Sequence, residues 1–138
     1  MAKQSKFNLK QVEKGGRTAM ERSLILIGNE AKNFFVNSFR LQGFEDVNVQ
    51  KWKPRKKQTK RNIGRAILVD SGDLRRSIIR QPVNKANLSV KISTDLVYAK
   101  VHNEGIGKMP KRQFIGNSYK LNENCKKIVV SQLDKIFK

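Results

Sequence analysis

The chain has 138 residues and a formal net charge of +19, from 30 Lys and Arg against 11 Asp and Glu. Its length suits one domain, residues 1–138, which can bury a core without metal ions or disulfides. The single cysteine, Cys125, excludes an intramolecular disulfide, and no apolar run is long enough to span a bilayer. The composition indicates a protein made in a reducing cytoplasm, without membrane contact, whose charge favours a polyanion or an acidic protein as partner.

The first predicted element is a long amphipathic helix. Residues 1–16 are polar, end in two glycines and are expected to form a loose arm or a poorly packed first turn. From about residue 17 to Leu41, apolar residues recur at three- and four-residue spacing, which is the period of an amphipathic helix. Gly43 is expected to supply the left-handed residue that ends this helix.

A long basic loop is expected next, at residues 50–66. No acidic residue occurs between Asp46 and Asp70, and few side chains in this segment can be buried. The segment contains eight basic residues: Lys51, Lys53, Arg55, Lys56, Lys57, Lys60, Arg61 and Arg65. Three interpretations stay open: a solvated, disordered loop, a loop that contacts phosphates, and a loop that becomes ordered against an acidic neighbouring subunit. Trp52 either stacks on a base or, as we prefer, anchors the loop on the core.

The second half of the chain predicts a short helix, a hairpin and a second long helix. The short helix is expected at residues 68–80, with Asp70 or Ser71 as its cap. Alternating apolar and polar residues at 88–93 predict a half-buried strand, which a turn at 84–87 connects to a partner strand at 79–83. Residues 96–101 suit a strand end or a short helix, and residues 118–137 the last helix. Two long helices that flank a small antiparallel sheet give an α+β fold.

Three segments resemble a known family, the phage virion morphogenesis or tail completion proteins. Residues 68–78, the first motif, are similar to the family's Leu-x-x-Ser-Gly-x-Leu-x-x-Ser-Ile. Residues 98–105, the second motif, resemble Tyr-Ala-x-Ile-His-x-x-Gly, and residues 110–116, the third motif, resemble Pro-Ala-Arg-x-Phe-Leu-Gly. The residues that carry the resemblance, with a tryptophan in the upstream basic stretch, are Trp52, Leu68, Ser71, Gly72, Leu74, Ser77, Ile78, Tyr98, Ala99, His102, Gly105, Pro110, Arg112 and Phe114.

The resemblance implies a structural role without catalysis and without a cofactor. Proteins of this family finish or stabilise the end of the tail, or form part of the neck that joins the tail to the capsid. The resemblance therefore implies a location in the virion, at the tail or the head–tail joint, and other phage tail or neck proteins as partners. It also implies self-association as a homo-oligomeric ring.

No residue shows a catalytic or metal-binding pattern. His102 is the only histidine and, with one cysteine, leaves too few ligands for a zinc site; it is expected to hydrogen-bond backbone near the turn at Gly105. Cys125 lies on the apolar side of the last helix, where a buried structural thiol is expected. Asp70 and Asp73 stand at a predicted helix start, so capping explains them better than a pair of catalytic carboxylates.

Three functions can be compared on this basis. The first is a structural phage protein that acts by assembly, with Leu74, Ile78, Tyr98 and Phe114 keeping the fold. The second is a small basic nucleic-acid-binding protein with non-specific DNA contact, which the charge supports but no helix-turn-helix, zinc finger or RNA-binding signature does. The third, a small nuclease, has the least support. In the first two, the basic loop supplies the expected contacts.

Overall fold

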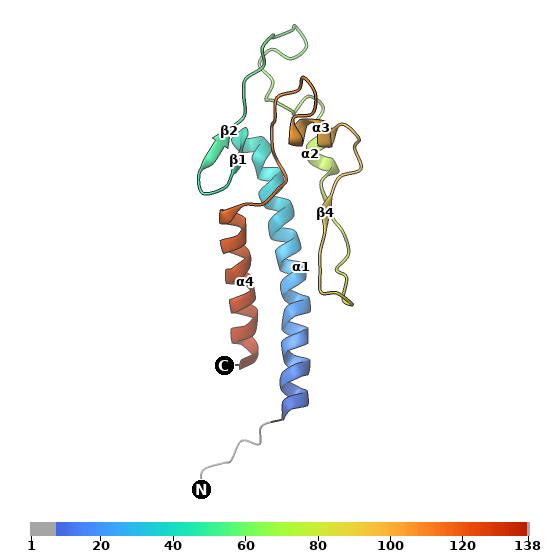
Figure 1. Cartoon of the computed structure of the whole chain (residues 1–138), viewed down its shortest axis with the longest axis vertical. Helices are drawn as coiled ribbons and strands as arrows, with labels where there is room; N and C mark the ends of the chain where they lie inside the picture. Colours follow the sequence, from blue (N-terminus) through green and yellow to red (C-terminus); the bar gives the residue numbers. More distant parts are fainter. Residues whose placement is uncertain (1–7, 138) are drawn as a thin grey trace.

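A computed structural model describes residues 8–137. Two helices, α1 (Leu9–Leu41) and α4 (Tyr119–Phe137), lie side by side along the long axis of an elongated molecule (Figure 1). We call this helical pair the stalk. Residues 42–78 and 94–118 gather at the end of the molecule where α1 terminates, and we call them, with the last turns of α1, the head (Figure 1). The basic loop lies at the tip of the head, and α1 begins and α4 ends at the opposite end of the stalk.

Helix α1 begins eight residues before the sequence pattern predicts. The Asn8 side chain caps it, because Oδ1 accepts hydrogen bonds from the backbone nitrogens of Lys10 and Gln11 at 3.1 and 3.3 Å. The helix continues through the two glycines, and Gly15 lies against Ile136 of α4. Residues 9–16 are therefore helical and do not form a loose arm, but most of them are exposed, as expected for a poorly packed first turn. Residues 1–7 lie outside the described part of the chain.

The end of α1 also differs from the prediction. Gln42, and not Gly43, adopts the left-handed conformation, with a φ of 54°. Gly43 instead opens strand β1 (Gly43–Glu45), which pairs antiparallel with β2 (Val49–Lys51). A Cβ atom at Gly43 would lie 2.5 Å from the carbonyl oxygen of Gln50. The glycine is needed at this position because the two strands approach closely there.

A second hairpin packs beside the middle of α1. Strand β3 (Ile79–Arg80) pairs antiparallel with β4 (Ile92–Ser93), and an isolated bridge joins Asn84 to Ser89. The predicted turn at 84–87 is confirmed, but the strand predicted over 88–93 is shorter, since Leu88 has a φ of 50° and belongs to the turn. Gly28 allows this hairpin to pack closely against α1, because a Cβ atom at this position would lie 2.4 Å from Arg80 Cδ.

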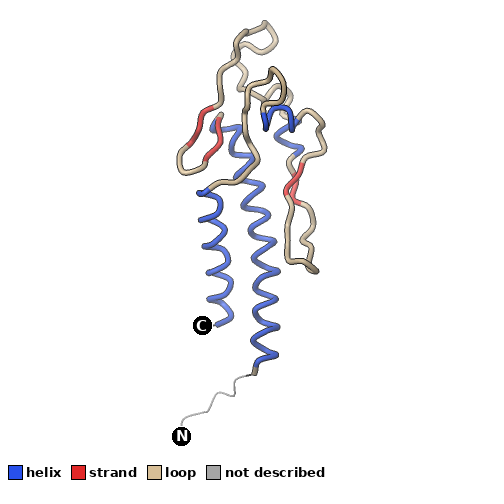
Figure 2. The backbone as a smooth tube through the Cα atoms, viewed as in Figure 1, coloured by secondary structure: helices blue, strands red, loops and turns tan. Residues whose placement is uncertain are grey.

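The α+β class predicted from the sequence is confirmed, with a different arrangement of its parts. The strands form two separate two-stranded sheets (Figure 2), and the long helices pack directly on each other. The helix predicted at 68–80 is reduced to α2 (Asp73–Ser77), whose N-cap is Gly72 with a φ of 79° and no side-chain cap. Residues 99–104 form a short helix, α3 (Ala99–Glu104).

Two clusters of buried side chains make the core. One lies in the head and consists of Phe39, Trp52, Leu74, Ile78, Ala99 and Phe114. The other lies where α1, β1 and α4 meet and consists of Ala31, Phe35, Phe44 and Leu121. Each fully buried large apolar side chain contributes about 1.5–3 kcal/mol of transfer free energy. Tyr98 lies outside both clusters and is 43% exposed, so the expectation that it forms part of the core is wrong.

Candidate interface: the basic loop and its supports

The three motifs, which are separate in the sequence, meet in the head. Leu74 and Ile78 of the first motif, Ala99 of the second and Phe114 of the third all belong to the same buried cluster. Ser77 ties the first motif to the segment before the second, because its hydroxyl lies 2.6 Å from the Thr94 hydroxyl. The motifs therefore build one structural unit, on which the basic loop is mounted.

The second and third motifs are joined by the side chain of Asn103. Its Oδ1 accepts hydrogen bonds from the backbone nitrogens of Phe114 and Ile115, both at 2.9 Å, and its Nδ2 donates to the Ile115 carbonyl at 3.0 Å. Gly105 ends α3 with a φ of 69°, and a Cβ atom there would lie 2.7 Å from the Lys111 nitrogen. The family glycine is thus required both by its conformation and by the close approach of the third motif.

The third motif holds the start of the basic loop. Trp52 is buried, its ring lies edge-on to Phe39, and its Nε1 donates a hydrogen bond to the Gln113 carbonyl at 2.8 Å. Arg112 is 7% exposed, and its Nε and Nη2 donate to the Lys53 carbonyl at 3.1 and 2.9 Å. Trp52 therefore anchors the loop on the core, and its ring is not available for stacking on a base.

Gln42 holds the other end of the basic loop. Its Oε1 accepts a hydrogen bond from the backbone nitrogen of Ile67 at 2.6 Å, and its Nε2 donates to the Ile67 carbonyl at 3.1 Å. The side-chain amide of Gln42 therefore makes the two hydrogen bonds that a neighbouring strand would make with Ile67, and it joins the end of α1 to the segment that leads into the first motif. The loop is consequently fixed at both ends by side chain to backbone hydrogen bonds.

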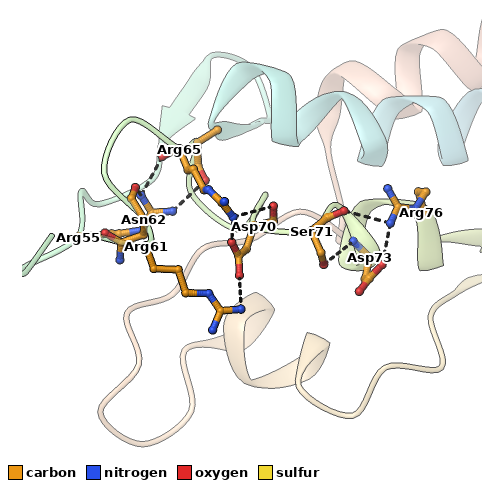
Figure 3. A network of polar contacts seen from close by, with 9 residues as sticks. Arg55, Arg61, Asn62, Arg65, Asp70, Ser71, Asp73 and Arg76 are labelled. Carbon is orange, nitrogen blue, oxygen red and sulfur yellow. Dashed lines mark hydrogen bonds and ion pairs between the residues drawn. The ribbon is translucent and has the colours of Figure 1, made fainter. Parts of the chain in front are cut away.

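The arginines of the basic loop are used within the loop (Figure 3). Arg55 donates to the carbonyls of Arg65 and Ala66, both at 2.8 Å, and so spans the base of the loop. Asp70, at the start of the first motif, pairs with Arg61 at 3.1 Å and also with Arg65. The Asp70 carboxylate thus binds two arginines of the loop and holds the loop against the first motif.

The lysines of the basic loop are used differently. Lys51 Nζ donates to the Leu41 carbonyl at 2.7 Å, at the end of α1. The side chains of the remaining four are exposed, and their ammonium groups have no hydrogen bond or ion pair with any residue between 8 and 137: Lys53, Lys56, Lys57 and Lys60. The eight predicted contact residues therefore separate into four that build the loop and four whose charge is directed to solvent.

The titratable residues beside the loop have structural roles. Hydrogen bonds with the Ser71 side chain and from Arg76 Nη2, at 2.7 Å to Oδ1, lower the pKa of the Asp73 carboxyl. Burial, with a smaller effect of the Arg112 charge, lowers the pKa of His102. The expected backbone hydrogen bond of His102 is not found for Nδ1, which is buried and without a partner in the described chain. His102 forms an edge contact with Tyr98 instead, and both line a cavity of about 290 Å³ with Asp70.

Cys125 is partly buried on α4, facing α1. Burial raises the pKa of its thiol, and the nearby Glu30 carboxylate acts in the same direction. This environment favours the neutral thiol and suits the structural role expected from the sequence. Among residues 8–137, no three His, Cys, Asp or Glu side chains lie close enough together to hold a metal ion.

Two residues that support the loop were not predicted from the sequence. Gln42 stands after the last apolar residue of a helix, a position where glycine or asparagine is the usual signal. Asn103 lies at an unspecified position of the second motif. An asparagine in the last turn of a short helix is a weak signal for a side chain that caps a neighbouring loop, and its partners are eleven and twelve residues away.

The comparisons agree with the motifs. The sequence matches the phage virion morphogenesis family over residues 17–134, most of the chain. No curated protein and no solved structure matches it. Within the described residues, no helix is long and apolar enough to cross a membrane. Since the match includes most of both stalk helices and all three motifs, the chain belongs to the phage virion morphogenesis family and has a structural role in the assembly of the phage particle.

Proposed function

We propose that the protein completes the tail or joins it to the capsid, as a virion component that acts by binding. The observation that carries this proposal is the construction of the head. The third motif holds the start of the basic loop, and Gln42 and Asp70 hold its other side. Four lysine side chains of the loop have ammonium groups without a partner in the described chain: Lys53, Lys56, Lys57 and Lys60. A loop that is fixed at both ends and exposes positive charge suits a contact with another macromolecule.

Self-association as a closed ring is part of the proposal. Large apolar side chains are exposed along the stalk, including Ile25 and Leu26 on α1 and Val130 and Phe137 on α4. Exposed apolar groups on neighbouring helices suit a contact between copies, and head-to-tail contacts close into a ring when the rotation between copies allows. In such a ring the heads would lie together and present their lysines to DNA in the passage or to an adjoining ring of acidic protein.

The test is particle assembly in the absence of the protein. A phage with a nonsense mutation in this gene is expected to produce filled capsids and separate tails, visible by electron microscopy, and infectivity is expected to return when the gene is supplied in trans. A variant with Lys53, Lys56, Lys57 and Lys60 changed to Glu is expected to fold but not to restore infectivity. Normal joined virions in the absence of the protein would overturn the proposal.

The alternative is a nucleic-acid-binding protein that acts alone. The charge of +19 favours it, because lysines that neutralise phosphates release counterions and give strong, salt-sensitive binding. Light scattering and a DNA titration at low and moderate salt separate the two functions. Tight duplex binding by a strict monomer would favour the alternative, whereas a ring of defined mass supports the assembly role.

A further inference from the structure

A cleft of about 260 Å³ lies at the base of the basic loop. Three of its lysines, Lys53, Lys56 and Lys57, come from the loop, and the fourth, Lys108, comes from the turn that precedes the third motif. No acidic residue lines the cleft. Two segments about fifty residues apart in the sequence thus contribute four lysines to one cleft.

The walls of the cleft are apolar. Pro54 and Pro110 line it together with Met109, whose side chain is 39% exposed. The two prolines have restricted backbones, and Met adapts its shape to different apolar groups. The cleft therefore combines an apolar interior with a rim of positive charge.

Two residues of the head, Arg112 and Gly105, fix the walls of the cleft. Arg112 lines it and donates hydrogen bonds to the carbonyls of Lys53 and Pro54, which ties one wall to the third motif. Gly105 keeps the other wall in place through the close approach of its backbone to Lys111. The backbone of both walls is thus fixed before a ligand enters, so the entropic cost of binding is confined to the exposed side chains that the ligand contacts.

We propose that this cleft binds an acidic segment of a partner protein, with one apolar side chain inserted between flanking carboxylates. The proposal rests on the assembly function and names the chemistry of the contact. Lysines at the rim attract carboxylates, and the apolar walls receive a side chain that the DNA backbone does not possess. The cleft also offers no aromatic ring on which a base could stack, because no aromatic side chain lines it and Trp52 is buried.

The experiment is a binding titration of the purified full chain, followed by fluorescence anisotropy. The probes are a short glutamate peptide with one central leucine, the same peptide with a central glycine, and a duplex DNA of equal charge. The leucine peptide is expected to bind about tenfold more tightly than the glycine peptide, because a leucine side chain becomes buried. Equal affinities of the two peptides, or tighter binding of the DNA, would overturn the proposal.

Three variants locate the site. Lys108→Glu is expected to weaken binding of the leucine peptide by about tenfold, whereas Lys60→Glu, an equal change of charge in the same loop but outside the cleft, weakens it by about twofold. Met109→Ala is expected to remove most of the difference between the leucine and glycine peptides. Equal effects of Lys108→Glu and Lys60→Glu would show a general charge attraction and overturn the assignment.

The same data separate this inference from the proposed function. Peptide binding is measured on the isolated chain, so it succeeds or fails without reference to the virion. If the chain binds the leucine peptide selectively but the nonsense mutant assembles normal particles, the proposed binding cleft stands and the proposed tail function is wrong. If the nonsense mutant fails to assemble but the chain does not bind the leucine peptide selectively, the proposed tail function stands and the proposed binding cleft is wrong. Circular dichroism of each variant checks that the fold is unchanged.

Discussion

The stalk and the head of this molecule are stabilised in different ways. In the stalk, α1 and α4 pack along a seam of side chains that recur at helical spacing, such as Ala31, Phe35 and Leu121. In the head, segments with little regular structure are joined by side chains that bond to distant backbone, such as Trp52 to Gln113 and Gln42 to Ile67. The difference shows that short elements can support a charged loop when a few polar side chains replace the hydrogen bonds of a sheet.

Removal of Trp52 is expected to be the most damaging single change to the head. Trp52→Ala should lower the free energy of unfolding by about 3–5 kcal/mol, because it removes a large buried ring from the centre of the cluster. Trp52→Phe should cost less, about 1–2 kcal/mol, since it keeps most of the ring and loses the hydrogen bond to Gln113. Urea unfolding measures both, and equal losses would contradict the role of the buried ring.

Asn103 tests whether polar side chains hold the head together. Asn103→Ala leaves the backbone nitrogens of Phe114 and Ile115 without their acceptor and is expected to cost about 1–3 kcal/mol. The control is Asn33→Ala on the exposed side of α1, where a change within about 0.5 kcal/mol is expected. Denaturant unfolding of both variants makes the comparison, and similar effects at the two sites would contradict it.

His102 links the stability of the head to pH. Its pKa is lowered in the folded chain, so below the usual value of about 6.5 the unfolded chain binds a proton that the folded chain does not. Stability should therefore fall as the pH decreases from about 6.5 toward the folded pKa, by less than about 1 kcal/mol because the ring is partly exposed. Thermal melts near neutral and mildly acidic pH should show a smaller loss for His102→Gln, and an unchanged pH profile would contradict this account.

Asp70 is expected to affect the shape of the basic loop more than its stability. Asp70→Asn removes the common partner of Arg61 and Arg65, which are exposed pairs worth at most about 1 kcal/mol. Without it, trypsin should cleave within residues 55–65 more rapidly. Asp73→Asn is the control, because its pair with Arg76 lies outside the loop. The same cleavage rate in both variants would show that the pairs do not organise the loop.

The contrast between the two regions also explains which features the sequence predicts. Helical periodicity is a local property, so both long helices and the turn at 84–87 are predicted from the sequence. The start of α1 is not predicted, because the Asn8 cap and the contact of Gly15 with α4 stabilise the helix despite the two glycines. The first motif has a good helical pattern, yet Gly72 and Leu68 have positive φ and only Asp73–Ser77 is helical. Which basic residues of the loop form bonds within the chain depends on Asp70 and on carbonyl groups distant in the sequence, and the composition does not reveal these partners.

The position of the basic loop relative to the helix ends has a practical consequence. Helix α1 starts and α4 stops at one pole, and the basic loop lies at the other (Figure 1). A fluorophore or surface linker attached at the pole of Asn8 and Phe137 would leave the loop unobstructed. Molecules immobilised there would all orient the same way, so a sensor chip could report binding to the charged tip alone.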